Sequence, residues 1–244
     1  MTIRIAAICA SAAFLATSAS AATITQWNFN STVPDANVGT GSTTASLGTG
    51  SASLIGGATA TFASGDSEGG SSDPASGDDS AWNLTTWPSQ GTASGTRGAR
   101  FALSTVGFQN IVVTWDQRNS NTAPNALQLQ YTLNGSTFTS AGLANNGIVT
   151  VNAGTTWFNG QSVDLSSIAG AANNANFAIL LVAVFAPSTS AYAASNSGSS
   201  FGTSGTIRLD MVTISGDAIT VIPLPTSAGL ATLALGAITA RRRR

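Results

Sequence analysis

The chain has 244 residues, of which only 8% are charged, and it contains no histidine, no lysine and a single cysteine. Without histidine or lysine, Ser-His-Asp catalysis, histidine-ligated zinc or copper and Schiff-base chemistry are excluded. Between residues 23 and 220, four arginines stand against ten carboxylates, a net charge of −6. Such a surface repels phosphate backbones, so we expect no nucleic-acid partner.

Residues 1–21 have the pattern of a secretory signal peptide. Arg4 supplies a positive start, an apolar stretch runs from Ile5 to Thr17, and Ala19-Ser20-Ala21 fits the small-residue cleavage rule. We therefore expect a signal helix that is removed on export. The only cysteine, Cys9, lies inside this segment, so the mature chain is expected to have no disulfide and no thiol chemistry.

The body of the chain, residues 22–220, has the pattern of an all-β domain. Alternation over residues 23–30 places Thr25, Trp27 and Phe29 on one face, which we expect to be the core face. Long loops rich in small residues are expected at 31–50, 64–80 and 186–204. Further strands are predicted at 52–63, 98–104, 109–117, 126–133, 147–152, 155–158, 161–165, 176–185 and 206–215.

Two of these segments carry a stronger signal. Residues 176–185 are apolar on both faces, which is typical of a central strand. Asn134-Gly135 predicts a tight hairpin turn with Phe138 on the returning strand. Short strands with turn residues between them, and no long amphipathic helix, indicate a two-sheet antiparallel sandwich.

A cluster of carboxylates lies in the loop at 64–80. Hard oxygen ligands separated by glycine and serine suit Ca²⁺, although the spacing is not that of an EF-hand. The alternative is a solvated acidic loop without a metal. The candidate ligands are Asp66, Glu68, Asp73, Asp78 and Asp79.

Two other carboxylates fall in predicted strands. Asp116 is near Arg118, and Asp210 is near Arg208. We expect each to form an ion pair or a turn hydrogen bond. Glycoside hydrolysis would need two carboxylates in one site, and an Asp-dependent hydrolase is the least favoured of the functions considered.

Three tryptophans fall in or beside loop-like stretches. Exposed aromatic rings can stack on sugar faces through their apolar area. Trp82, Trp87 and Trp157 are therefore candidate sugar contacts, with packing in the core as the alternative.

The last 24 residues have three parts in a fixed order. Val221-Ile222-Pro223-Leu224-Pro225 is followed by a mostly apolar run over 226–240 and then by Arg241, Arg242, Arg243 and Arg244. The uncharged stretch 224–240 would span about 25 Å as a helix, enough for a short transmembrane helix. The arginines would remain on the cytoplasmic side.

This tail resembles the PEP-CTERM sorting signal of Gram-negative-type bacteria, in a VPLP-type variant with Leu224 at the position of the usual glutamate. The resemblance implies an exosortase-like membrane protease as partner and transient insertion into the inner membrane. It also implies recognition of Pro223, Leu224 and Pro225, and removal of the helix with Arg241–Arg244. A permanent anchor, and a sortase signal at Leu224-Pro225-Thr226-Ser227-Ala228, are the alternatives.

The body is similar to the jelly-roll domains that precede such tails. The stretches that carry the similarity are ITQWNF, NIVVTWDQRNS, DLSSIAGAANNANFAI and IRLDMVTISG. We expect an exported protein of the cell surface or extracellular matrix that is structural or adhesive and not an enzyme. The alternative is a carbohydrate-binding module that contacts polysaccharide, with Ca²⁺ as the one possible cofactor.

Overall fold

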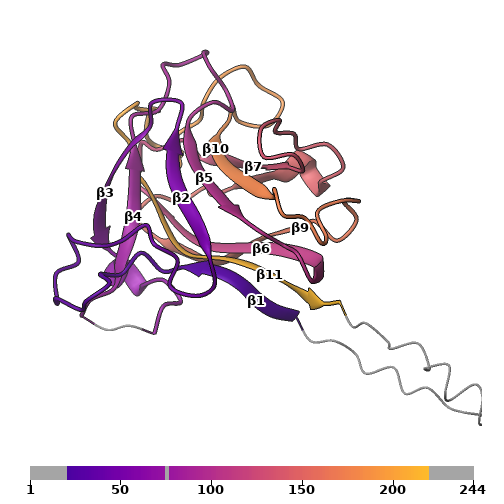
Figure 1. Ribbon diagram of the computed structural model, residues 1–244. Coiled ribbons are helices and arrows are strands. Elements are labelled where there is room, and N and C mark those ends of the chain that lie inside the picture. Colours follow the sequence, from indigo (N-terminus) through magenta and orange to yellow (C-terminus); the bar gives the residue numbers. More distant parts are fainter. Residues whose placement is uncertain (1–20, 75–76, 220–244) are drawn as a thin grey trace, which may run out of the picture.

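Two antiparallel β-sheets packed face to face form the domain (Figure 1). The computed structural model describes residues 21–74 and 77–219. Two short 3-10 turns, η1 (Ser67–Gly69) and η2 (Ala144–Gly147), accompany the strands. The strands are β1 (Ala21–Trp27), β2 (Gly50–Ile55), β3 (Thr59–Ser64), β4 (Ser80–Thr85), β5 (Gly98–Leu103), β6 (Phe108–Asn119), β7 (Ala126–Thr132), β8 (Ile148–Thr150), β9 (Trp157–Asp164), β10 (Ala178–Ala183) and β11 (Ile207–Ala218).

The six-stranded sheet has the order β3-β4-β11-β6-β9, and β1 also pairs with β11. β4 and β1 lie end to end along one edge of β11, because β4 pairs with residues 207–209 and β1 with residues 212–217. The five-stranded sheet has the order β2-β5-β10-β7-β8. The predicted all-β, two-sheet antiparallel sandwich is confirmed.

Both predicted terminal helices, the signal helix in 1–21 and the membrane helix of the tail, lie outside the described residues apart from Ala21, which begins β1. Within the described part of the chain, no helix has the length and apolar character needed to cross a membrane.

Aromatic side chains from both sheets fill the centre of the sandwich. The Phe101 ring lies 5.1 Å from that of Trp27, 6.4 Å from Phe29 and 6.1 Å from Trp82, measured between centroids. All four side chains are buried. The predicted inward face of the first strand is confirmed, since Thr25, Trp27 and Phe29 are each at most 1% exposed.

β10 is the central strand of its sheet, as its sequence predicted. It pairs with β5 on one side and β7 on the other, and all six of its residues are buried. Leu180 and Val182 belong to a second, smaller apolar cluster, outside the main core that contains Ile179 and Leu181. A strand packed on both faces needs apolar residues at every position, which is the pattern seen in the sequence.

The segment 52–63 was predicted as one strand, and this is wrong. It contains β2 and β3, which belong to different sheets. The chain turns between them at Gly56 and Gly57, both with positive φ. A Cβ at Gly56 would lie 1.9 Å from the carbonyl oxygen of Thr96, so only glycine fits this turn.

The tight hairpin predicted at Asn134-Gly135 is replaced by a wider loop. Only Gly135 has a positive φ, whereas the tight turn requires it at both central residues. The Asn134 side chain instead accepts hydrogen bonds from the backbone N–H groups of Ser136 and Thr137. The chain returns through a single bridge between Tyr131 and Thr139, and Phe138 belongs to no strand.

Two further strands, β4 and β9, differ from the prediction. β4 was not predicted at all. The segments 155–158 and 161–165, predicted as two strands, form the single strand β9. Its pairing with β6 shifts register between Trp115 and Gln117, opposite Gly160, whose φ is positive. A bulge of this kind interrupts the alternation that a sequence pattern relies on.

The segment between β3 and β4 lies against the outer face of the six-stranded sheet. We call residues 65–74 the strap. The Trp157 indole N–H in β9 donates to the Ser67 carbonyl at 2.8 Å, and the Arg208 guanidinium in β11 donates to the Ser67 hydroxyl at 2.9 Å. Arg208 and Asp210 alternate with the core residues Ile207 and Leu209, so they point toward the strap.

Candidate functional site

The three candidate sugar-contact tryptophans are all buried, so this prediction is wrong. Trp82 is 4% exposed, Trp87 1% and Trp157 8%. Trp82 stacks on Phe29, the Trp87 indole donates to the Gly205 carbonyl at 2.7 Å, and the strap covers Trp157. Each aromatic side chain in the described ranges is either buried or half-buried.

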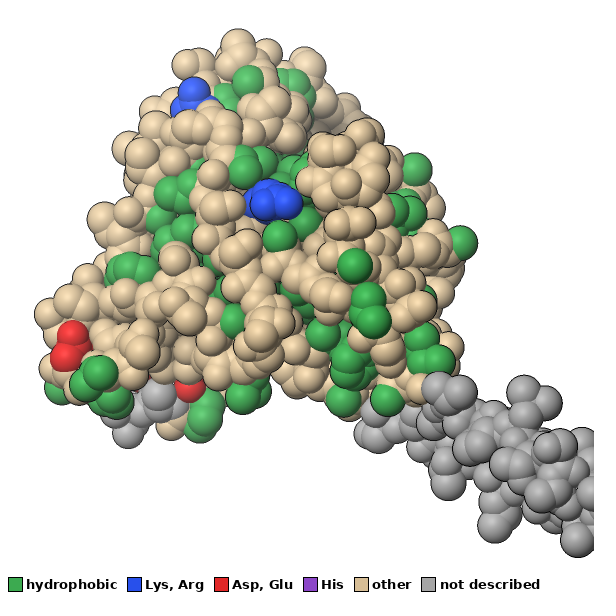
Figure 2. All heavy atoms as spheres, in the orientation of Figure 1, with side chains coloured by type: hydrophobic (Ala, Val, Ile, Leu, Met, Phe, Trp, Pro, Cys, Tyr) green, Lys and Arg blue, Asp and Glu red, His purple; other side chains and the backbone are tan. Residues whose placement is uncertain are grey.

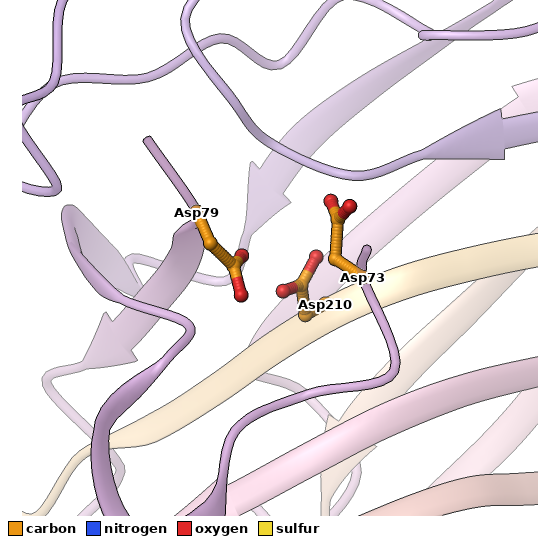
Figure 3. A group of neighbouring side chains, drawn as sticks. All are labelled: Asp73, Asp79 and Asp210. Carbon is orange, nitrogen blue, oxygen red and sulfur yellow. The ribbon is translucent and has the colours of Figure 1, made fainter. Parts of the chain in front are cut away.

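The candidate calcium ligands divide into two groups. Asp73 and Asp79 come together with Asp210, with one oxygen of each within 4.8 Å of the others (Figure 3). Asp66, Glu68 and Asp78 lie outside this group. Asp66 and Glu68 are exposed, and the Asp78 carboxylate accepts a hydrogen bond from the Asp35 backbone N–H.

We call Asp73, Asp79 and Asp210 the carboxylate cluster. Its members come from the strap, from the residue before β4, and from β11. Asp79 and Asp210 are 0% exposed, and their carboxylates point toward each other in Figure 3. The Asn30 side-chain amide donates to Asp73 at 2.9 Å, which joins the segment after β1 to the cluster.

Burial sets the electrostatics of the carboxylate cluster. Loss of water raises the pKa of both Asp79 and Asp210 above its ordinary value, because the charged form is poorly solvated there. The nearby charge of Asp79 raises the pKa of Asp210 further. Without a cation, burial therefore favours the protonated forms of the pair, whereas a bound cation would favour both charged forms.

Neither strand carboxylate forms the ion pair that was considered for it. Asp116 is 2% exposed and accepts hydrogen bonds from the backbone N–H groups of Ser72 and Gly160, at 2.5 Å and 2.7 Å. It is thus a structural link between the strap and β9. Arg208 donates to the Ser64 carbonyl and the Ser67 hydroxyl rather than to Asp210.

A neutral hollow of about 320 Å³ lies over β7, β8 and the loop after β10, and we call it the amide hollow. The Gln130 side chain donates to that of Gln128, which in turn donates to the Asn146 carbonyl at 2.9 Å. Its lining is Ser94, Gly95, Gln128, Gln130, Asn146, Ile148, Val184, Phe185, Ala186, Pro187, Ser188 and Thr189.

The amide hollow was not foreseen from the sequence. Gln128 and Gln130 lie in the segment 126–133, which was predicted only as a strand. Charged side chains are also sparse on the face of the molecule shown in Figure 2.

The candidate sorting residues lie outside the described residues. They are Pro223, Leu224, Pro225, Arg241, Arg242, Arg243 and Arg244.

No protein-family model matches the chain, and no curated protein matches it. Among solved structures, it is similar to the CBM22-1 xylan-binding domain from Paenibacillus barcinonensis, with 12% identity and a TM-score of 0.37 over 69% of this chain and 87% of that one. The tandem CBM22-1-CBM22-2 structure from the same organism has 11% identity and a TM-score of 0.40, over 88% of this chain and half of the tandem.

A cleaved adhesin domain of Lys-gingipain is also similar, with 12% identity and a TM-score of 0.32 over 68% of this chain and 88% of that domain. These values are too low for any ligand or activity of those proteins to be transferred to this chain.

Proposed function

We propose that the chain is an exported protein of the cell surface or extracellular matrix, structural or adhesive, and sorted by an exosortase-like membrane protease. One observation carries this proposal. β1 and β11 pair antiparallel with Ala22, the expected first residue of the mature chain, opposite Gly216, so the chain enters and leaves the sandwich at the same end. A signal at one terminus and a sorting tail at the other would then both be attached there, leaving the opposite end free for contacts.

The order of strands supports the jelly-roll form of sandwich. The run β4-β11-β6-β9 in one sheet faces β5-β10-β7-β8 in the other. Most consecutive strands therefore alternate between the sheets, and each sheet is built from strands distant in the sequence, as in two interlocked Greek keys.

A non-enzymatic role is supported by the chemistry of the side chains. Histidine and lysine are missing from the sequence. The carboxylate cluster is buried between the strap and β11 rather than lining one of the surface hollows. Its carboxylates are therefore poorly placed to reach a polymeric substrate.

The proposed processing of the tail is tested by expressing the protein in a bacterium that carries an exosortase. Intact-mass measurement of the surface protein is expected to show a chain that begins at Ala22 and lacks Arg241–Arg244. Replacing Pro223 and Pro225 by alanine should leave the tail in place and hold the protein in the membrane fraction, whereas Pro187→Ala, in a body loop, should be processed normally.

Each alternative gives a different mass. A permanent anchor retains all four arginines, and sortase cleavage leaves Ser227 as the last residue of the chain. Either mass would refute exosortase-like sorting.

Carbohydrate binding is the second candidate function, and the amide hollow is the observation that favours it. Amide groups both donate and accept hydrogen bonds, as sugar hydroxyls do, and the uncharged lining suits a neutral polysaccharide. Phe185 and Ile148 supply apolar area beside the amides.

Binding is tested on an array of neutral polysaccharide fragments. Gln130→Ala is expected to weaken binding by about tenfold, the effect of losing roughly 1.4 kcal/mol of contacts. Ser162→Ala, an exposed change on the other sheet, should leave binding unchanged. Flat binding curves, or an equal loss in both variants, would reject the amide hollow as a sugar site.

A further inference from the structure

The strap is an ordered segment without the apolar side chains that usually hold a loop in place. Its sequence is GDSEGGSSDP, so burial of apolar area contributes very little to its position. Ordering its backbone costs roughly 1–2 kcal/mol per residue. Its fixed position must therefore come from polar contacts with the sheet below it.

Two buried oxygens beneath the strap accept no hydrogen bond from any N–H or hydroxyl group in the described residues. They are Oδ1 of Asp79 and Oδ2 of Asp210. Both residues are 0% exposed, and Figure 3 shows that their carboxylates face each other with Asp73 beside them. Two charged carboxylates buried face to face are strongly unfavourable, so either a proton or a metal cation has to lie between them.

In the described part of the chain, no side chain places a positive charge against Asp79 or Asp210. Arg208, the nearest arginine on β11, uses its guanidinium for the Ser64 carbonyl and the Ser67 hydroxyl. No arginine in residues 21–74 and 77–219 forms an ion pair with Asp79 or Asp210.

The backbone also leaves room for the carboxylates. A Cβ at Gly65 would lie 2.1 Å from Oδ1 of Asp79, so any other residue there would displace that carboxylate. Glycine at the first position of the strap thus lets Asp79 reach the centre of the cluster.

We propose that Asp73, Asp79 and Asp210 form a calcium site that fastens the strap to β11. The donors are carboxylate oxygens only, and the chain has no histidine, which favours a hard cation over zinc. Calcium accepts six to eight oxygens in an adaptable geometry, so carbonyl groups and water can complete the shell. Mg²⁺ demands a smaller octahedral site and loses its water reluctantly.

The proposed site is tested by removing bound metal from the purified protein with EGTA and then titrating the protein with calcium. We expect one equivalent to bind with a Kd of about 10⁻⁴ M, in the range of extracellular calcium modules. At a hundredfold excess over Kd the melting temperature should rise by about 5–10 °C. Amide hydrogen exchange of residues 65–74 should slow at the same time. Mg²⁺ should bind more weakly.

Three variants separate this site from a general effect of acidic residues. Asp79→Asn and Asp210→Asn are expected to weaken calcium binding at least tenfold and to abolish the rise in melting temperature. In EGTA both should be no less stable than the unaltered protein, because an amide removes a buried charge. Asp66→Asn is the matched control, since it removes an exposed charge from the same strap and should leave binding intact.

Two results would overturn the site. One is the absence of binding heat and of any change in hydrogen exchange at 10 mM calcium, on the order of a hundred times the expected Kd. The other is an equal loss of affinity in Asp66→Asn and Asp210→Asn. Neither result bears on whether the tail is processed, so the sorting proposal is tested independently.

Discussion

Replacing Phe101 by alanine is expected to lower the free energy of unfolding by about 3–5 kcal/mol. Its ring lies at the centre of the aromatic group formed by Trp27, Phe29 and Trp82, and it is 0% exposed. Because the neighbours are large rings held on the opposite sheet, by β1, the residues just after it and β4, they cannot collapse into the space that the substitution leaves. Urea unfolding followed by tryptophan fluorescence measures the loss.

Two companion variants control this experiment. Phe101→Leu should lose markedly less than Phe101→Ala, since it fills part of the space. Val106→Ala, at a side chain that is 54% exposed, should change the free energy of unfolding by no more than about 0.5 kcal/mol. A loss below 1 kcal/mol for Phe101→Ala would show that the two sheets do not meet over this ring.

Asp116→Ala is expected to cost about 2–4 kcal/mol of stability and to release the strap from β9. The Asp116 carboxylate accepts from the backbone N–H groups of Ser72 and Gly160. Two hydrogen bonds to a carboxylate are lost, each contributing about 1.5–3 kcal/mol, and water recovers part of this loss at the exposed residues Ser72 and Gly160. Denaturant unfolding gives the loss, and hydrogen exchange of residues 65–74 and of Gly160 shows where the structure loosens.

Asp164→Ala is the matched control. Asp164 is also a strand carboxylate, at the end of β9, but it is exposed and accepts only from the Ser166 backbone N–H. Its loss should stay below about 1 kcal/mol. If Asp116→Ala and Asp164→Ala cost the same, Asp116 does not hold the strap.

Most of the fold could be predicted from the alternation of apolar and polar residues along each strand. The strands that were missed depend on pairing with segments that are distant in the sequence. β1 and β10 could be recognised because their burial follows directly from their own residues. β4 could not, because its six residues are a strand only through pairing with β3 and β11. Likewise, the chain passes from one sheet to the other at the turn between β2 and β3, and the small residues in this segment do not indicate that change.

The candidate site shows the same limit. Asp73 and Asp79 were named as calcium ligands because they lie close together in an acidic loop. Asp210 was read as a partner of Arg208, since sequence distance favours that pair. The structure instead places Asp210 beside Asp79, because β11 runs next to β4. Trp157 was misjudged for a related reason, since the strap that covers it lies far away in the sequence.

The pairing of β11 has a mechanical consequence. β11 leads directly toward the tail, and it is hydrogen-bonded to β4 and β1 along one edge and to β6 along the other. Tension applied through the C-terminal end would pull along the strand axis and load these hydrogen bonds together, in shear, rather than opening them one at a time. While its tail is held, the domain would therefore resist unfolding under force better than a domain tethered through an edge strand.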